Sequence, residues 1–130
     1  MIIDTSAIIA VLRNEPEVRN LLRLMLRSET PLRISAANYV ECGAVIDSVR
    51  DAVASRRLDE FLRRLNTIIE PVTVEHAEVA RQAYRDFGKG SGHPAGLNFG
   101  DCFAYALAKV AQEPLLFIGA DFSHTDVEAA

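Results

Sequence analysis

Residues 1–7 read Met-Ile-Ile-Asp-Thr-Ser-Ala, so that an acidic residue directly follows the apolar run that opens the chain. A run of this kind is typical of a short buried strand, and Thr5 or Ser6 can cap a helix that begins after it. A carboxylate at the end of a buried strand is costly unless it is paired, hydrated or bound to a cation. Asp4 is therefore the first candidate for a functional residue.

Three further acids stand at or just past the ends of apolar runs: Glu41, Asp101 and Asp121. If the fold gathers all four acids, they would suit Mg²⁺ or Mn²⁺, because these cations prefer oxygen ligands. Two direct carboxylate ligands and two acting through water are suited to metal-assisted attack on a phosphate. Taken singly, each acid also has a structural explanation: Asp4, Asp101 and Asp121 can cap a helix or turn, and Glu41 can be a surface acid.

The predicted elements alternate between short strands and amphipathic helices. Strands are predicted at residues 1–4, 32–34, 68–72 and 115–118, and helices are predicted in the segments between them. This alternation predicts an α/β fold with a small parallel sheet of about four to five strands, flanked by helices on both faces. Ligands of such sheets bind beyond the carboxyl ends of the strands, at a switch in strand order. This rule would bring Asp4 and Asp121 together.

The length and composition indicate one domain over residues 1–130. The chain has 130 residues, of which 49% are hydrophobic and 25% charged, as in ordinary soluble globular proteins. No apolar stretch approaches the roughly 18 residues that span a bilayer. No basic segment precedes the first acid, so no signal peptide is predicted. We therefore expect a cytoplasmic protein without a membrane segment.

The net charge of −4 argues against a protein that coats nucleic acid through a basic surface. It leaves open an enzyme whose acidic site attracts a phosphate only once cations occupy it. The arginines at positions 19, 23 and 27 follow a helical spacing. They predict a solvated helix face, with contact to RNA or to an acidic partner as the alternative.

The two cysteines, Cys42 and Cys102, each follow one of the candidate acids. Two cysteines are too few for a disulfide framework, and they lack the paired spacing of zinc sites. We expect small buried residues, with a reactive or metal-binding thiol as the alternative. The glycine-rich segment 88–96 lacks the order of a phosphate-binding P-loop, and we expect a mobile loop that faces the substrate.

The segments that hold the four acids resemble the motifs of PIN domains of the VapC type. Residues 1–7 resemble the opening of a PIN domain, and Tyr39-Val40-Glu41-Cys42 matches the second acidic motif. The segment 98–108 (Asn-Phe-Gly-Asp-Cys-Phe-Ala-Tyr-Ala-Leu-Ala) and the segment 119–122 (Gly-Ala-Asp-Phe) resemble the third and fourth. The resemblance covers essentially the whole chain in order, and it implies a single PIN-like nuclease domain.

The resemblance also implies roles for these residues. Asp4 and Asp101 would be the principal ligands of Mg²⁺ or Mn²⁺, and Glu41 and Asp121 would complete a catalytic acidic pocket. Ser6 matches a hydroxyl that helps to orient the site in this family. Asp126 also recurs in similar sequences near the pocket, but Asp121 is favoured as the fourth acid.

The implied function is that of a metal-dependent endoribonuclease, the toxin of a type II toxin–antitoxin pair. Water activated by the metal would hydrolyse an RNA phosphodiester and leave 5′-phosphate and 3′-hydroxyl ends. The implied partners are a small cognate antitoxin, the RNA substrate and a second copy of the chain in a homodimer.

Two rival interpretations follow from the same residues. A catalytically weak PIN-fold module that binds RNA or a protein partner is the main alternative, and the presence of all four acids counts against it. A phosphotransfer fold is the other. The dehalogenase type would need Asp-x-Asp, where this chain has Ser6, and the receiver type would need a lysine after the last strand, where none follows Lys109.

Overall fold

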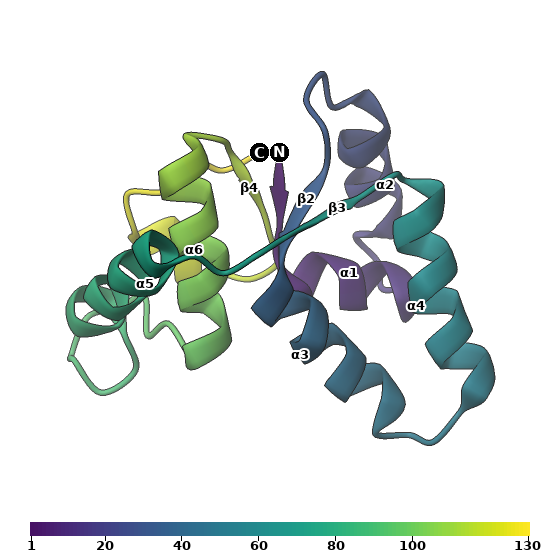
Figure 1. Cartoon of the computed structure of the whole chain (residues 1–130), viewed down its shortest axis with the longest axis horizontal. Helices are drawn as coiled ribbons and strands as arrows, with labels where there is room; N and C mark the ends of the chain where they lie inside the picture. Colours follow the sequence, from purple (N-terminus) through teal and green to yellow (C-terminus); the bar gives the residue numbers. More distant parts are fainter.

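A four-stranded, wholly parallel sheet forms the centre of the computed structural model, which describes residues 1–130 (Figure 1). Its strands are β1 (Ile2–Ile3), β2 (Arg33–Ser35), β3 (Ile68–Glu70) and β4 (Leu115–Leu116). Their order across the sheet is β3-β2-β1-β4. The predicted α/β fold with a small parallel sheet is therefore confirmed.

Helices cover both faces of this sheet. They are α1 (Thr5–Leu12), α2 (Val18–Arg27), α3 (Ala36–Asp47), α4 (Ala52–Arg64), α5 (Val74–Phe87) and α6 (Phe99–Ala111), followed by the 3₁₀ turn η1 (Asp121–His124). In Figure 1, α1 to α4 lie on one side of the sheet, and α5 and α6 lie on the other. No helix is long and apolar enough to span a membrane.

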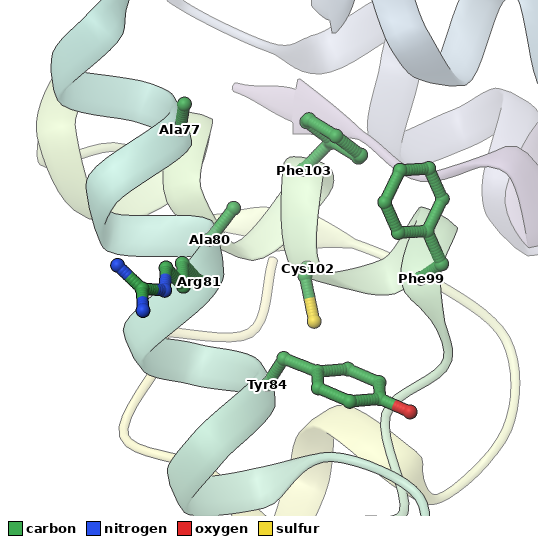
Figure 2. Close-up of a pocket in the computed structure, with 7 residues that line it drawn as sticks. All are labelled: Ala77, Ala80, Arg81, Tyr84, Phe99, Cys102 and Phe103. Atoms are coloured by element: carbon green, nitrogen blue, oxygen red, sulfur yellow. The ribbon is translucent and has the colours of Figure 1, made fainter.

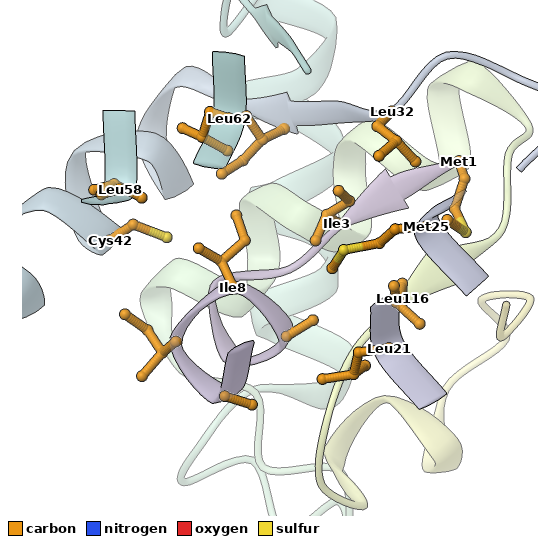
Figure 3. Close-up of a cluster of buried hydrophobic side chains, with 14 of the residues drawn as sticks. Met1, Ile3, Ile8, Leu21, Met25, Leu32, Cys42, Leu58, Leu62 and Leu116 are labelled. Carbon is orange, nitrogen blue, oxygen red and sulfur yellow. The ribbon is translucent and has the colours of Figure 1, made fainter. Parts of the chain in front are cut away.

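The two central strands, β1 and β4, each contribute one residue to each of two cores. Successive side chains of a strand point to opposite faces. Ile3 therefore packs with Ile8 and Met25 in the core beneath α1 to α4, which Figure 3 shows. Ile2 packs in the second core, with α5 and α6. Both isoleucines are completely buried, which fixes the register of β1 in the sheet.

The strand order creates a switch point beside β1. The chain steps outward from β1 to β2 and β3, and then returns to place β4 on the other side of β1. Ile3 is paired with Leu116, and the backbone N–H of Asp4 donates to the Leu116 carbonyl at 2.9 Å. The carboxyl ends of β1 and β4 therefore lie side by side, at the place where open α/β sheets bind ligands.

Several local features differ from the sequence expectation or refine it. Asp4 itself caps α1, by accepting a hydrogen bond from the Ser6 N–H, so neither Thr5 nor Ser6 is the cap. β3 ends at Glu70, because Pro71 has no N–H to continue the ladder. Both cysteines are buried free thiols, as expected. The three arginines of α2, at positions 19, 23 and 27, are exposed to solvent.

Candidate functional site

Asp4 occupies the carboxyl end of β1 and is only 3% exposed. Its Oδ2 accepts hydrogen bonds from the Ser6 backbone N–H at 2.8 Å and from Ser6 Oγ at 2.6 Å. Its Oδ1 is buried and has no hydrogen-bond partner. Burial raises the pKa of the Asp4 carboxyl, against these hydrogen bonds, and the charge of Glu41 adds to the rise. An unpartnered, buried carboxylate oxygen suits a cation that is held at this strand end.

Ser6 links Asp4 to the other strand at the switch point. While its hydroxyl donates to Asp4, its Oγ accepts a hydrogen bond from the backbone N–H of Ile118 at 3.0 Å. Ile118 lies two residues beyond β4, on the way to Asp121. The hydroxyl thus fixes the Asp4 rotamer and ties the segment after β4 to the start of α1.

Glu41 reaches the same region from α3. Thr5 Oγ1 donates to Glu41 Oε2 at 2.6 Å, and Asn38 Nδ2 donates to the same oxygen at 3.1 Å. Oε1 has no hydrogen bond to the protein. Gly100 of α6 gives the carboxylate its room, because a Cβ at this position would overlap Glu41 and lie 2.6 Å from its Cδ.

Thr5, Asn38 and Gly100 are parts of the site that the sequence interpretation did not identify. Two signals could have pointed to them. Asn38 precedes Glu41 by three residues and therefore shares its helix face. Thr5 and Gly100 are chain neighbours of the candidate acids Asp4 and Asp101. Their contacts with Glu41, however, join segments that lie far apart in the sequence.

Asp101 stands in the first turn of α6, in a reciprocal capping box with Asn98. Its Oδ2 accepts from the Asn98 N–H at 2.7 Å, while Asn98 Oδ1 accepts from the Asp101 N–H at 2.9 Å. Oδ1 of Asp101 has no hydrogen bond to the protein. Burial raises the pKa of Asp101 to about 6, and the negative charges of the other three acids add to the rise. The other three candidate acids are therefore close enough to Asp101 to interact with it electrostatically.

The two candidates for the fourth acid lie in different surroundings. Asp121 opens η1, is exposed, and raises the pKa of Asp101 through its charge. Asp126 instead accepts hydrogen bonds from the Tyr105 hydroxyl and from Lys109 Nζ, farther along α6. These bonds lower the pKa of the Asp126 carboxyl, and the bond from Tyr105 contributes most. The structure gives Asp126 no hydrogen bond to a group of the acidic site.

The carboxylates share one arrangement. Asp4, Glu41 and Asp101 each have one oxygen held by protein donors and one oxygen without a protein hydrogen bond. No three His, Cys, Asp or Glu side chains converge closely enough to ligate one ion directly. Mg²⁺ usually binds one or two carboxylates and keeps several waters, so it requires no such convergence. The oxygens that lack a protein hydrogen bond are of the donor type that such a cation prefers.

Two mainly apolar hollows lie beside α6, and the first of them has a candidate acid in its wall. One, of about 390 Å³, lies between α3 and α6 and includes Glu41, Val40 and Phe99 in its wall. The other, of about 250 Å³, lies between α5 and α6, and Figure 2 shows Phe99 and Phe103 beside it with Tyr84 at its far end. The Phe99 side chain is 76% exposed and packs edge-to-face on Phe103, with 4.9 Å between the ring centroids. The acidic site thus opens onto a partly apolar surface.

Comparison with known proteins agrees with this geometry. The family model of the PIN domain matches residues 1–128. The chain is 55% identical to ribonuclease VapC28 of Mycobacterium tuberculosis, over 100% of this chain and 97% of that protein. It is 46% identical to ribonuclease VapC of Mycolicibacterium smegmatis, over 99% of this chain and 98% of that protein.

Solved structures share the fold at low sequence identity. The crystal structure of Mycobacterium tuberculosis VapC20, a toxin that cleaves the sarcin-ricin loop, superposes with a TM-score of 0.76 at 15% identity, over 99% of this chain and 97% of that chain. A toxin–antitoxin complex from Klebsiella pneumoniae gives a TM-score of 0.74 at 16% identity, over 99% and 95%. The resemblance seen in the sequence motifs is confirmed: the chain belongs to the PIN-domain family, among its VapC-type toxins.

Proposed function

We propose that this protein is a Mg²⁺- or Mn²⁺-dependent endoribonuclease and the toxin of a type II toxin–antitoxin pair, acting in the cytoplasm as a single nuclease domain over residues 1–130. The observation that carries the proposal is the shared arrangement of Asp4, Glu41 and Asp101. Each has one oxygen fixed by the protein and one oxygen free for a cation or a water molecule. The VapC relatives at 46–55% identity, which are named as ribonucleases, support the same activity.

The residues divide the work as follows. Asp4 and Asp101 would hold the cation, since both are buried enough to have raised pKa values and both keep one oxygen free. Bound Mg²⁺ or Mn²⁺ would lower the pKa of water and stabilise charge on the attacked phosphate. Glu41 and Asp121 would orient a water molecule and accept its proton as its oxygen bonds to phosphorus. The bond from phosphorus to the 3′-oxygen would break and this oxygen would take a proton from solvent, which leaves a 5′-phosphate and a 3′-hydroxyl. Ser6 holds Asp4 in the required rotamer.

The proposed partners are RNA, a small cognate antitoxin and a second copy of the chain. The hollow that contains Glu41 in its wall would bring a bound strand of RNA next to the acids. An antitoxin segment that occupied the same hollow would block access to them. The exposed apolar side chains Phe99 and Val40 offer contact area to such a segment.

A cleavage assay tests the activity. Purified protein is incubated with total bacterial RNA in Mg²⁺, in Mn²⁺ or in EDTA, and the new RNA ends are mapped by sequencing. We expect cleavage only with a cation, and its loss by at least about a hundredfold in Asp4→Asn and Asp101→Asn, because removing a group that acts on the reacting phosphate commonly has this effect. Asp59→Asn, on the exposed face of α4, is the matched control and should cleave normally.

The same assay decides between the candidates for the fourth acid. Asp121→Asn should reduce cleavage, whereas Asp126→Asn should retain it, because the Asp126 carboxylate is bonded to Tyr105 and Lys109. Equal cleavage by wild type, Asp4→Asn and Asp101→Asn would contradict the proposed nuclease. A protein that binds RNA without cleaving it would instead be the catalytically weak binding module.

A further inference from the structure

Asn38 is completely buried, at the point where three helices meet beside Glu41. It lies on α3, one turn before Glu41, and its side chain reaches Thr5 at the start of α1 and Gly100 in the first turn of α6. No other polar side chain in the protein is 0% exposed. Its position calls for an explanation, because a fully buried amide is costly unless its hydrogen bonds are made.

The surroundings of Asn38 require an amide nitrogen at one particular point. Nδ2 donates to the Gly100 carbonyl at 3.0 Å and to Glu41 Oε2 at 3.1 Å, and it lies 3.4 Å from Thr5 Oγ1. A carbonyl and a carboxylate can only accept hydrogen bonds, so these neighbours fix the orientation of the amide. An aspartate of the same shape would place an oxygen against two acceptors.

The other half of the amide argues against a purely structural role. Oδ1 of Asn38 is buried and has no hydrogen-bond partner. An apolar side chain of similar shape would avoid this cost, so packing alone does not favour asparagine here. What asparagine supplies, and an apolar residue does not, is the donor that faces Glu41 and the first turn of α6.

The contacts of Asn38 act on the conformation of Glu41. Thr5 and Asn38 direct their donors to the same oxygen, Oε2, and so leave Oε1 without a protein partner. Gly100 lies on the other side of the carboxylate. Because glycine has no Cβ, the carboxylate fits beside its backbone. The Glu41 side chain is thereby confined to one rotamer, in which Oε1 lies beside Gly100 without a protein hydrogen bond.

We propose that Asn38 is a positioning residue for Glu41: it fixes the carboxylate between α3 and α6 with Oε1 free. This inference rests on the proposed nuclease function, in which Glu41 acts through its free oxygen. Asn38 itself touches neither substrate nor cation.

Asn38→Leu is the decisive variant, because leucine has nearly the same branched shape but donates no hydrogen bond. We expect it to fold, with a Tm close to that of the wild type, and to lose cleavage and Mn²⁺ affinity by about 10–100-fold, as is usual when a residue that orients a metal site is removed. Asn38→Asp, which sets a carboxylate against Glu41, should lose at least as much. Ile46→Ala, which truncates a buried side chain on the same helix, is the control. It should lower the Tm and leave Mn²⁺ affinity and cleavage unchanged at temperatures below thermal unfolding.

A double-mutant cycle with Glu41→Gln separates positioning from a general effect. If Asn38 acts through Glu41, Asn38→Leu should reduce cleavage by less than about twofold in the Glu41→Gln background, because effects of coupled residues are not additive. An equal fold-loss in both backgrounds would overturn the inference. So would unchanged cleavage and Mn²⁺ affinity in the folded Asn38→Leu protein.

A crystal structure of Asn38→Leu gives a readout that does not depend on activity. We expect the Glu41 carboxylate to leave the position beside Gly100 or to be distributed over several rotamers. A Glu41 side chain that stays in place would overturn the inference, whatever the assays show. If wild-type protein neither cleaves RNA nor binds Mn²⁺, the proposed function fails, and the position of Glu41 in this structure still decides the role of Asn38.

Discussion

At the scale of single residues, the site is defined by which carboxylate oxygens the protein leaves free. Ser6, Asn38 and the backbone N–H of Asn98 each hold one oxygen of an acid. Burial is the main reason that the pKa values of Asp4 and Asp101 are raised, and the charges of the neighbouring acids add to the rise. The protein thus keeps these acids at an energetic cost that a bound cation would offset.

Gly100→Ala should displace Glu41 without harming the fold. A Cβ at Gly100 would overlap the end of the Glu41 side chain, which is flexible and would have to move. Cleavage should fall by about tenfold or more, while stability should stay equal or rise by up to about 1 kcal/mol, because alanine is favoured over glycine within a helix. RNA cleavage and thermal unfolding measure the two effects.

Gly43→Ala is the matched control for this change. Gly43 lies within α3, and a Cβ there would contact only Asp47 Oδ2, at an ordinary 3.9 Å. It should give the same helix stabilisation with unchanged cleavage. Unchanged cleavage in Gly100→Ala as well would show that the position of Glu41 is unimportant.

At the scale of elements, helix starts set the positions of two of the acids. Asp4 caps α1, and Asp101 belongs to the capping box that begins α6. The structural explanations considered for these two acids are therefore correct, and they hold together with a place in the site. In the structure, Ser35 caps α3 and Asp51 caps α4 in the same way. Three adjacent residues, Asp4 to Ser6, can all serve as the cap of α1, and in the structure Asp4 does so rather than Thr5 or Ser6.

Asn98→Ala should destabilise α6 and reduce cleavage together. The substitution removes the acceptor for the Asp101 N–H, which typically costs about 0.5–2 kcal/mol. The first turn of α6 would then fray more readily, and Asp101 would lose its fixed position. Thermal unfolding and cleavage at a temperature well below the Tm measure the two effects.

Thr73→Ala is the comparison for Asn98→Ala, because Thr73 caps α5 in the same type of box. We expect a stability loss of similar size and unchanged cleavage, since the first turn of α5 holds none of the candidate acids and its one acidic residue, Glu75, is exposed to solvent. If both variants lost cleavage equally, the effect would come from stability and not from the position of Asp101.

At the scale of the whole molecule, the strand order brings distant segments together. Alternating strands and helices predicted the parallel sheet, and the strand ends predicted the positions of Asp4 and Asp121. Neither signal could reveal that Asn38 reaches the Gly100 carbonyl, since this contact spans 62 residues and depends on how α3 packs on α6. Uncharged residues such as Thr5 and Asn38 also have many common structural roles. The charged residues of the candidate site could therefore be proposed from the sequence, and the groups that hold them could not.

The coupling of stability to pH and Mg²⁺ is a property of the entire fold. The folded-state pKa of Asp101, about 6, lies above its ordinary value of 3.8. Between these pH values the folded protein binds more protons than the unfolded chain, so Asp101 makes metal-free stability fall as the pH rises through this window. Mg²⁺ requires the ionised carboxylates, and its stabilisation should therefore be large at about pH 7.5 and small at about pH 5. A cation that binds only the folded state, at about ten times its Kd, adds about 1.4 kcal/mol to the free energy of unfolding.

Thermal unfolding in EDTA and in MgCl₂ across this pH range measures the effect, and Asp101→Asn serves to subtract the titration of all other groups. The variant should lose both the Mg²⁺ shift and this part of the pH slope; a Mg²⁺ shift that is equal at both pH values, or that survives in Asp101→Asn, would mean that Asp101 holds no cation.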